Sequence, residues 1–214
     1  MKIRLILAGV AACVAALSAG TPALAQNLLS DPGFESGGTG TSWSIFNGGA
    51  FSQTFAHTGT WSMNDDGHGG FGVPGSFETL PTSAGLSYDL TGFGLTPSAP
   101  GAGTTFGALQ ITFFSGPNGS GSNLGTVQTS PGNALVSNQI NASSPTSLWI
   151  PLDTGIATAP VGSQSLEVFT IVVDQNPANV YFDDLSLVQV PEPSSFAFAG
   201  LAALGLFAAR RQRK

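Results

Sequence analysis

Short runs of alternating apolar and polar residues, separated by turn-forming clusters, dominate the chain from residue 26 to 190. Such period-two runs are typical of β-strands with one buried face, and no long amphipathic helical pattern interrupts them. The clusters between them are rich in Gly, Asn and Pro, residues that favour tight turns. The expected strands are 48–55, 77–80, 86–93, 108–114, 124–129, 147–152, 165–174 and 180–188. This pattern predicts an all-β fold, an antiparallel β-sandwich.

The C-terminus has a different pattern, a polar motif followed by a continuous apolar run. Pro191, Glu192 and Pro193 come first, and the apolar run occupies 196–209. As a helix, its 14 residues would reach roughly 21 Å against a hydrocarbon core of about 30 Å, which is short for a permanent span. It suits a transient inner-membrane anchor. The basic end that follows should stay cytoplasmic. It consists of Arg210, Arg211, Arg213 and Lys214.

This tripartite arrangement resembles the PEP-CTERM sorting signal of Gram-negative bacteria. In that family a Pro-Glu-Pro tripeptide precedes a hydrophobic helix and an Arg-rich end, as residues 190–214 do here. The resemblance implies that exosortase, a membrane cysteine transpeptidase or protease, recognises the motif and cleaves there. It also implies that the protein is exported to the cell envelope, the cell surface or the extracellular matrix. The alternative is a plain C-terminal membrane anchor.

The N-terminus has the pattern of a secretory signal peptide. Lys2 and Arg4 form a basic start, an apolar stretch follows at 3–17, and Ala23-Leu24-Ala25 provides a small-x-small cleavage pattern. We therefore expect signal peptidase to cut between Ala25 and Gln26. A lipoprotein signal ending at Cys13 is the competing interpretation. The predicted organisation is a signal peptide at 1–25, a jelly-roll domain at 26–189 and a sorting signal at 190–214.

Charge is distributed unevenly between these parts. All six Lys and Arg residues lie in the two terminal signals, and the body from 26 to 190 has none. The body carries eleven acidic residues and so has a net charge of −11. Nucleic-acid binding is excluded as a function, because it needs Lys and Arg to neutralise phosphates. Divalent cations are the natural counter-charge for such a surface.

Two motifs at the ends of the body resemble the galactose-binding-like jelly roll found in carbohydrate-binding modules. Asn-Leu-Leu-Ser-Asp-Pro-Gly-Phe-Glu opens the body at 27–35, and Tyr-Phe-Asp-Asp-Leu-Ser-Leu closes it at 181–187. Between them, His-Thr-Gly-Thr-Trp-Ser at 57–62 also fits the pattern. The resemblance implies a jelly-roll sandwich in which the first and last strands are neighbours, so that Phe34 and Phe182 share one core face.

The same neighbourhood predicts a calcium site. Glu35 would lie near Asp183 and Asp184, and three carboxylates without a basic partner repel one another. A Ca²⁺ ion, which binds hard oxygen ligands, would relieve that repulsion, and the family resemblance implies a structural Ca²⁺ there. The alternative is that Asp183 caps a bulge while the other two face solvent. Asp65-Asp66-Gly67 resembles a fragment of a calcium loop, but the rest of that loop is missing, and we expect a turn there.

Catalysis finds little support in the sequence. His57 and His68 are the two histidines, they lack a zinc-binding spacing, and no nucleophile elbow or phosphate loop occurs. Aromatic residues could stack on sugars, although more of them are expected to fill the core. These candidates are Trp43, Trp61, Trp149, Tyr88 and Tyr181. The sequence therefore predicts a noncatalytic, exosortase-sorted surface or matrix protein. The alternatives are a carbohydrate-binding module for an exopolysaccharide or plant polysaccharide and, more distantly, a glycan-active enzyme.

Overall fold

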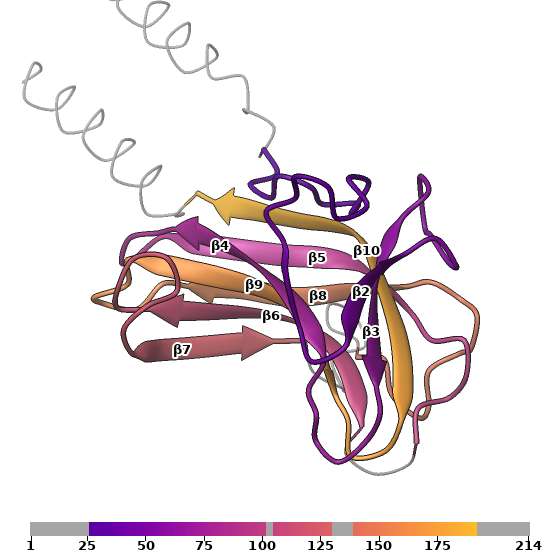
Figure 1. Cartoon of the computed structure of the whole chain (residues 1–214). Coiled ribbons are helices and arrows are strands. Elements are labelled where there is room, and N and C mark those ends of the chain that lie inside the picture. The colour runs from indigo at the N-terminus through magenta and orange to yellow at the C-terminus, as the bar shows by residue number, and fades with distance from the viewer. Residues whose placement is uncertain (1–25, 102–104, 130–138, 192–214) are drawn as a thin grey trace, which may run out of the picture.

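A computed structural model describes residues 26–101, 105–129 and 139–191 (Figure 1). Within these residues the chain forms ten β-strands. Their bounds are β1 Ser44–Phe46, β2 Gly49–Ser52, β3 Ser62–Gly67, β4 Gly75–Pro81, β5 Ser87–Leu95, β6 Phe106–Phe114, β7 Asn123–Gln128, β8 Ile150–Thr158, β9 Ser165–Val173 and β10 Ala178–Val190.

The strands form two antiparallel five-stranded sheets. Sheet A has the order β1-β4-β9-β6-β7, and sheet B has the order β2-β3-β10-β5-β8. Figure 1 shows the two layers, with β6, β7 and β9 in one and β5 and β10 in the other. The predicted all-β sandwich is therefore confirmed.

Most of the expected strands are present, but the N-terminal part of the body differs from the prediction. Strands β1 and β3 were not expected, and Asp65-Asp66-Gly67 lies inside β3. The predicted turn there is wrong, because β3 pairs with β2 on one side and β10 on the other. The strand expected at 147–152 is displaced along the chain. β8 begins at Ile150, after Ser147 with its positive φ of 55°, and continues to Thr158.

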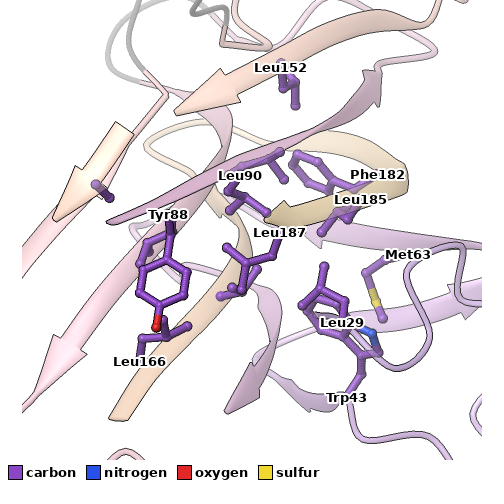
Figure 2. Close-up of a cluster of buried hydrophobic side chains, with 14 of the residues drawn as sticks. Leu29, Trp43, Met63, Tyr88, Leu90, Leu152, Leu166, Phe182, Leu185 and Leu187 are labelled. Carbon is purple, nitrogen blue, oxygen red and sulfur yellow. The ribbon is translucent and has the colours of Figure 1, made fainter. Parts of the chain in front are cut away.

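Alternate residues of facing strands fill the space between the sheets. In β9, Leu166, Val168 and Val172 are fully buried in one core cluster. Strand β10 contributes Leu185 and Leu187 from the opposite sheet. In Figure 2, Leu187 and Leu185 lie beside Leu90, while Leu29 and Trp43 lie together near Met63. Burial of these side chains is the main stabilising contribution of the domain.

The two end motifs meet as the resemblance implied. The Asn27 side chain donates to Leu185 O at 2.8 Å and accepts from Leu187 N at 3.0 Å. Phe34 and Phe182 are both fully buried in the same core cluster. The opening motif is a series of bends and turns rather than a strand. Its contact with β10 therefore depends on Asn27 and on the Leu28 N to Leu187 O hydrogen bond of 2.8 Å.

Most of the sorting and export signals lie outside the described residues. This applies to the predicted signal peptide at 1–25, to Glu192 and Pro193, and to the hydrophobic run and basic end within 192–214. Among the residues that the structure does describe, no helix is long and apolar enough to cross a membrane.

Candidate binding face and acidic cluster

A bulge in β10 places two carboxylates side by side. The register with β5 shifts between Asp183 and Ser186, and Asp184 has a left-handed φ of 47°. Because a bulge inserts an extra residue into the alternation, both side chains can turn toward the same loop. Asp183 is fully buried, whereas Asp184 is only partly covered.

The loop that receives them is 56–61, between β2 and β3. Asp183 Oδ2 accepts from His57 N at 2.6 Å and from Thr58 N at 3.3 Å. Asp184 Oδ1 accepts from the Thr58 hydroxyl at 2.7 Å, and its Oδ2 lies 2.6 Å from His57 Nδ1. The His57 ring also stacks on Phe93, with ring centroids 3.9 Å apart. His57 thus links the loop to the outer face of sheet B through Asp184 and Phe93.

Glu35 holds the other end of the same loop. Its carboxylate accepts from Thr60 N at 2.9 Å and from Trp61 N at 3.0 Å. A Cβ on Gly59 would lie 2.2 Å from Glu35 Oε1, and Gly59 also has a φ of 66°. Glycine is therefore required there on two grounds. A Cβ built on Gly33 would lie 3.6 Å from Asp184 Oδ1 and 3.8 Å from Asp183 Oδ1, so these two carboxylates face the opening motif. Only the Cγ of Glu35 comes near the same position, because its carboxylate turns to the backbone of Thr60 and Trp61.

These carboxylates meet only part of the requirement for a calcium site. They have no Lys or Arg neighbour, although the His57 ring contacts Asp184. Burial raises the pKa of Asp183 to about 6, with Asp184 adding to the rise. All three are hydrogen-bonded to groups of the 56–61 loop. The described residues contain no group of three His, Cys, Asp or Glu side chains arranged to hold a metal. The oxygen donors fit Ca²⁺ in kind, and calcium binding stays a prediction.

A second candidate site is the outer face of sheet A, the side that points away from the core. Successive side chains of a strand alternate between faces, so Glu167 and Phe169 of β9 point outward between the core residues Leu166, Val168 and Thr170. Strand pairing aligns Phe77 with Phe169, Phe169 with Gln110, and Gln110 with Gln128. We call this line the aromatic–amide row, Phe77–Phe169–Gln110–Gln128.

A parallel line of polar residues runs beside it. Thr79 aligns with Glu167, Glu167 with Thr112, and Thr112 with Thr126. We call this line the hydroxyl–carboxyl row, Thr79–Glu167–Thr112–Thr126. Phe46 of β1 extends the aromatic end, since its ring centroid is 6.1 Å from that of Phe77 and 6.3 Å from that of Phe169. Each row crosses four strands and so spans about 14 Å.

Two polar groups on this face are incompletely satisfied. Gln128 Nε2 is buried and has no hydrogen-bond partner in the part of the chain described. Burial also raises the pKa of Glu167 above its usual range, and a hydrogen bond with Thr79 offsets only part of that rise. Buried polar groups are normally paired, so Gln128 Nε2 and Glu167 are two groups on this side of sheet A that lack full pairing.

The aromatic residues singled out from the sequence mostly serve packing. Trp43, Tyr88 and Tyr181 are buried. Trp149 packs edge-on against His57 on the outer face of sheet B. Phe77 and Phe169 were not among the aromatic residues predicted to bind sugars, although the strand alternation indicates which face Phe169 occupies. In 165–174, Leu166, Val168, Thr170 and Val172 share one face, which assigns Phe169 to the other.

Comparison with known proteins identifies the sorting signal and the fold class. Residues 189–214 match the family model described as the PEP-CTERM protein-sorting motif. No curated protein matches the chain.

Several solved structures share the fold. The structure "Family 16 Carbohydrate Binding Module-2" is 19% identical with a TM-score of 0.53, covering 76% of this chain and 99% of the other. The CBM22-1 xylan-binding domain of Paenibacillus barcinonensis Xyn10C is 16% identical with a TM-score of 0.52, covering 80% and 99%. An arabinose-bound GH51 α-L-arabinofuranosidase is 18% identical with a TM-score of 0.53, covering 79% of this chain and 27% of the enzyme.

At these identities the structural matches show the fold alone. The body is a jelly-roll sandwich of the kind found in carbohydrate-binding modules, and the chain ends in a PEP-CTERM motif. That motif assigns the protein to exosortase-dependent sorting to the cell envelope.

Proposed function

We propose that this is an exported, noncatalytic surface or extracellular-matrix protein that binds polysaccharide on the outer face of sheet A. The observation that carries the proposal is the aromatic–amide row. Flat rings pack against the C–H faces of sugars, and amide groups bind their hydroxyls. Phe77 and Phe169 supply the rings, and Gln110 and Gln128 supply the amides in the same line.

The unpaired amide strengthens this assignment. A buried donor without a partner costs free energy, which a hydroxyl acceptor on a ligand would recover once the side chain turns outward to meet it. Gln128 Nε2 is such a donor. A row of four side chains about 14 Å long suits several linked sugars rather than one. A xylan-binding domain shares this fold, which supports a polysaccharide as the ligand here.

Charge limits the ligand class. The body has no Lys or Arg, so it has no basic side chain with which to bind a sulfated, phosphorylated or carboxylated glycan. We therefore expect neutral or positively charged polysaccharides to bind and anionic ones to be rejected.

A glycan array with the full chain in detergent micelles tests the proposal. We expect binding to at least one neutral or amino-sugar polymer, lost in Phe169→Ala and retained in Phe55→Ala, a substitution near sheet B. Absence of binding to every glycan would contradict the proposal. An activity screen on the bound polymer separates this function from that of a secreted glycan-active enzyme, because we expect no product.

We also propose that Ca²⁺ stabilises the acidic cluster through Glu35 and Asp183, with Asp184 as an additional ligand. The position of the two aspartate carboxylates beside Gly33 and the absence of Lys and Arg from the body support it. Bound there, the ion would contribute stability and no chemistry.

We propose the following route of export. Signal peptidase cleaves between Ala25 and Gln26, and the hydrophobic run then anchors the chain in the inner membrane until exosortase acts at Pro191, Glu192 and Pro193. The ordered signals in the sequence and the PEP-CTERM match support this route.

A further inference from the structure

The outer face of sheet A carries one ionisable side chain among its described positions, and it is acidic. Glu167 stands in the centre of the hydroxyl–carboxyl row, between Thr79 and Thr112 on the neighbouring strands. It is one pleat away from Phe169 on the same face of β9, a separation of about 7 Å. A sugar stacked on Phe169 would therefore place a substituent beside the Glu167 carboxylate.

The 115–122 loop, between β6 and β7, covers this carboxylate on one side. A Cβ on Gly119 would lie 1.9 Å from Glu167 Oε1, so the loop backbone closes over the acid. The loop is fixed by hydrogen bonds from Gly119 N to Ser165 Oγ at 2.9 Å and from Ser165 Oγ to Gly116 O at 2.6 Å. Glycine is favoured at 119 also because its φ is 70°.

Glu167 is poorly compensated in this position. Thr79 Oγ1 donates to it at 3.2 Å, and the structure shows no other side-chain hydrogen bond to it in the described part of the chain. Partial burial raises its pKa, which means that its charged form is disfavoured without a partner. The described part of the chain contains no Lys or Arg that could neutralise it. A cation on a ligand would supply the missing partner.

We propose that the ligand is a glycan with free amino groups, such as a partly de-N-acetylated hexosamine polymer, and that Glu167 binds its ammonium group. This rests on the proposed function. The rings of Phe77 and Phe169 favour a nearby cation as well as a sugar face. The net charge of −11 on the body attracts a polycationic chain over longer distances.

The experiment compares three probes of equal length by isothermal titration calorimetry with the full chain in micelles. The probes are a glucosamine hexamer, an N-acetylglucosamine hexamer and xylohexaose. We expect the free amine to bind about tenfold more tightly than its N-acetylated form, because a charge-assisted hydrogen bond replaces a neutral one. Raising the salt concentration should reduce this preference.

Matched variants separate a local ion pair from bulk charge. Glu167→Gln should abolish the tenfold preference while retaining binding to the N-acetylated hexamer. Asp66→Asn, which removes one charge from sheet B, should leave the preference intact. An unchanged preference in Glu167→Gln, or equal losses in both variants, would overturn the inference.

The remaining outcomes distinguish the inference from the proposed function. Equal binding of all three hexamers, lost in Phe169→Ala, would overturn the amino-sugar inference and keep the sugar-binding face. Calcium-dependent binding of an acidic polysaccharide instead would overturn the inference as well. If no probe or array glycan binds, the proposed function itself fails.

Discussion

Most acidic side chains in this body are held by backbone N–H groups and hydroxyls, because the body has no Lys or Arg. Asp174 is fully buried and accepts from Gly69 N at 2.6 Å and Val73 N at 2.8 Å. Glu78 accepts from Ser30 Oγ at 2.6 Å. Asp65 departs from this rule. It is fully buried between the sheets, and neither carboxylate oxygen has a partner of good hydrogen-bonding geometry among the described residues.

Replacing Asp65 by Asn should stabilise the protein at neutral pH. Burial raises the pKa of Asp65 well above its usual range, and the Thr170 hydroxyl offsets only a part of this rise. The unfolded chain has an Asp pKa near 3.9, so stability from this residue is full below about pH 4 and falls as pH rises toward the folded pKa. Asn has no charge to bury. We expect a gain of about 1–3 kcal/mol.

The measurement is the melting temperature of both proteins between pH 4 and 8. The Asp65→Asn advantage should grow with pH. Asp66 is the next residue and lies on the other face of β3, so Asp66→Asn should change the melting temperature little. If Asp65→Asn raises the melting temperature equally at pH 4 and pH 8, the buried charge of Asp65 is not the cause of the stabilisation.

Calcium removal gives a second test at the residue scale. An ion that binds only the folded state at a hundredfold excess over Kd stabilises it by about 2.7 kcal/mol. If Ca²⁺ binds as proposed, a chelator should lower the melting temperature by several degrees, and Glu35→Gln should remove most of that response. Identical melting temperatures with excess Ca²⁺ and with chelator would show that hydrogen bonds with loop 56–61 hold these acids without a metal ion.

At the scale of elements, periodicity predicted the longer strands well. Strands β5, β6, β9 and β10 are long enough for apolar alternation to be visible in the sequence. Strand β3 was missed because its residues Asn64, Asp65 and Asp66 are polar and disfavour strands on propensity alone. Its pairing with β2 and β10 is a long-range effect that overrides local preference.

The candidate sites, too, were predicted only in part from the sequence. The end motifs predicted that Glu35 and Asp183 would be close, and Gly33 lies next to both. The sequence did not predict that His57 binds Asp184, because the left-handed bulge at Asp184 cannot be read from local pattern. Nor did it reveal the two rows on sheet A. Those depend on the register between β4, β9, β6 and β7, which are separated along the chain.

The loop between β3 and β4 provides a test at the scale of elements, because one buried side chain fixes its conformation. Asp174 organises residues 69–73, where Phe71 and Val73 have positive φ values of 61° and 46° and Phe71 is 57% exposed. Asp174→Ala removes the buried carboxylate oxygens that accept from Gly69 N and Val73 N. We expect the free energy of unfolding to fall by about 2–3 kcal/mol. Limited proteolysis should then cleave near residue 71 earlier than in the wild type. Asp174→Asn, which keeps one acceptor oxygen, should be intermediate. Equal cleavage rates in all three proteins would contradict this role.

At the scale of the whole molecule, an acidic folded body lies between a basic N-terminal segment, proposed to be a signal peptide, and a C-terminal PEP-CTERM motif with a basic end. The PEP-CTERM motif at 189–214 directs sorting, and the sandwich is the domain that is carried to the envelope. An acidic domain without Lys or Arg repels the acidic surfaces of a cell and its nucleic acids. Such a domain is suited to a matrix of neutral or basic polysaccharide.

Replacing Glu192 should block C-terminal processing while leaving export intact. The sorting enzyme is expected to recognise the tripeptide, and the signal peptide acts independently of it. Intact-mass measurement of the protein from cells and medium reports both cleavages. A mature mass equal to that of the processed wild type, after correction for any retained substitution, would contradict the proposed recognition. Replacing Arg210, Arg211, Arg213 and Lys214 together should weaken membrane retention or misorient the helix.

The most direct test of the central claim is the affinity of the full chain for its best array glycan, measured by calorimetry. Substituting Phe77 and Phe169 by Ala removes the two rings of the aromatic–amide row. Each ring is expected to contribute roughly 1 kcal/mol or more beyond its buried area. The account predicts at least about a tenfold loss of affinity in the double variant, with an unchanged fold by circular dichroism. Trp149→Ala, on sheet B, should bind normally. Full affinity in the double variant, or a larger loss in Trp149→Ala, would place the binding site elsewhere and contradict the account.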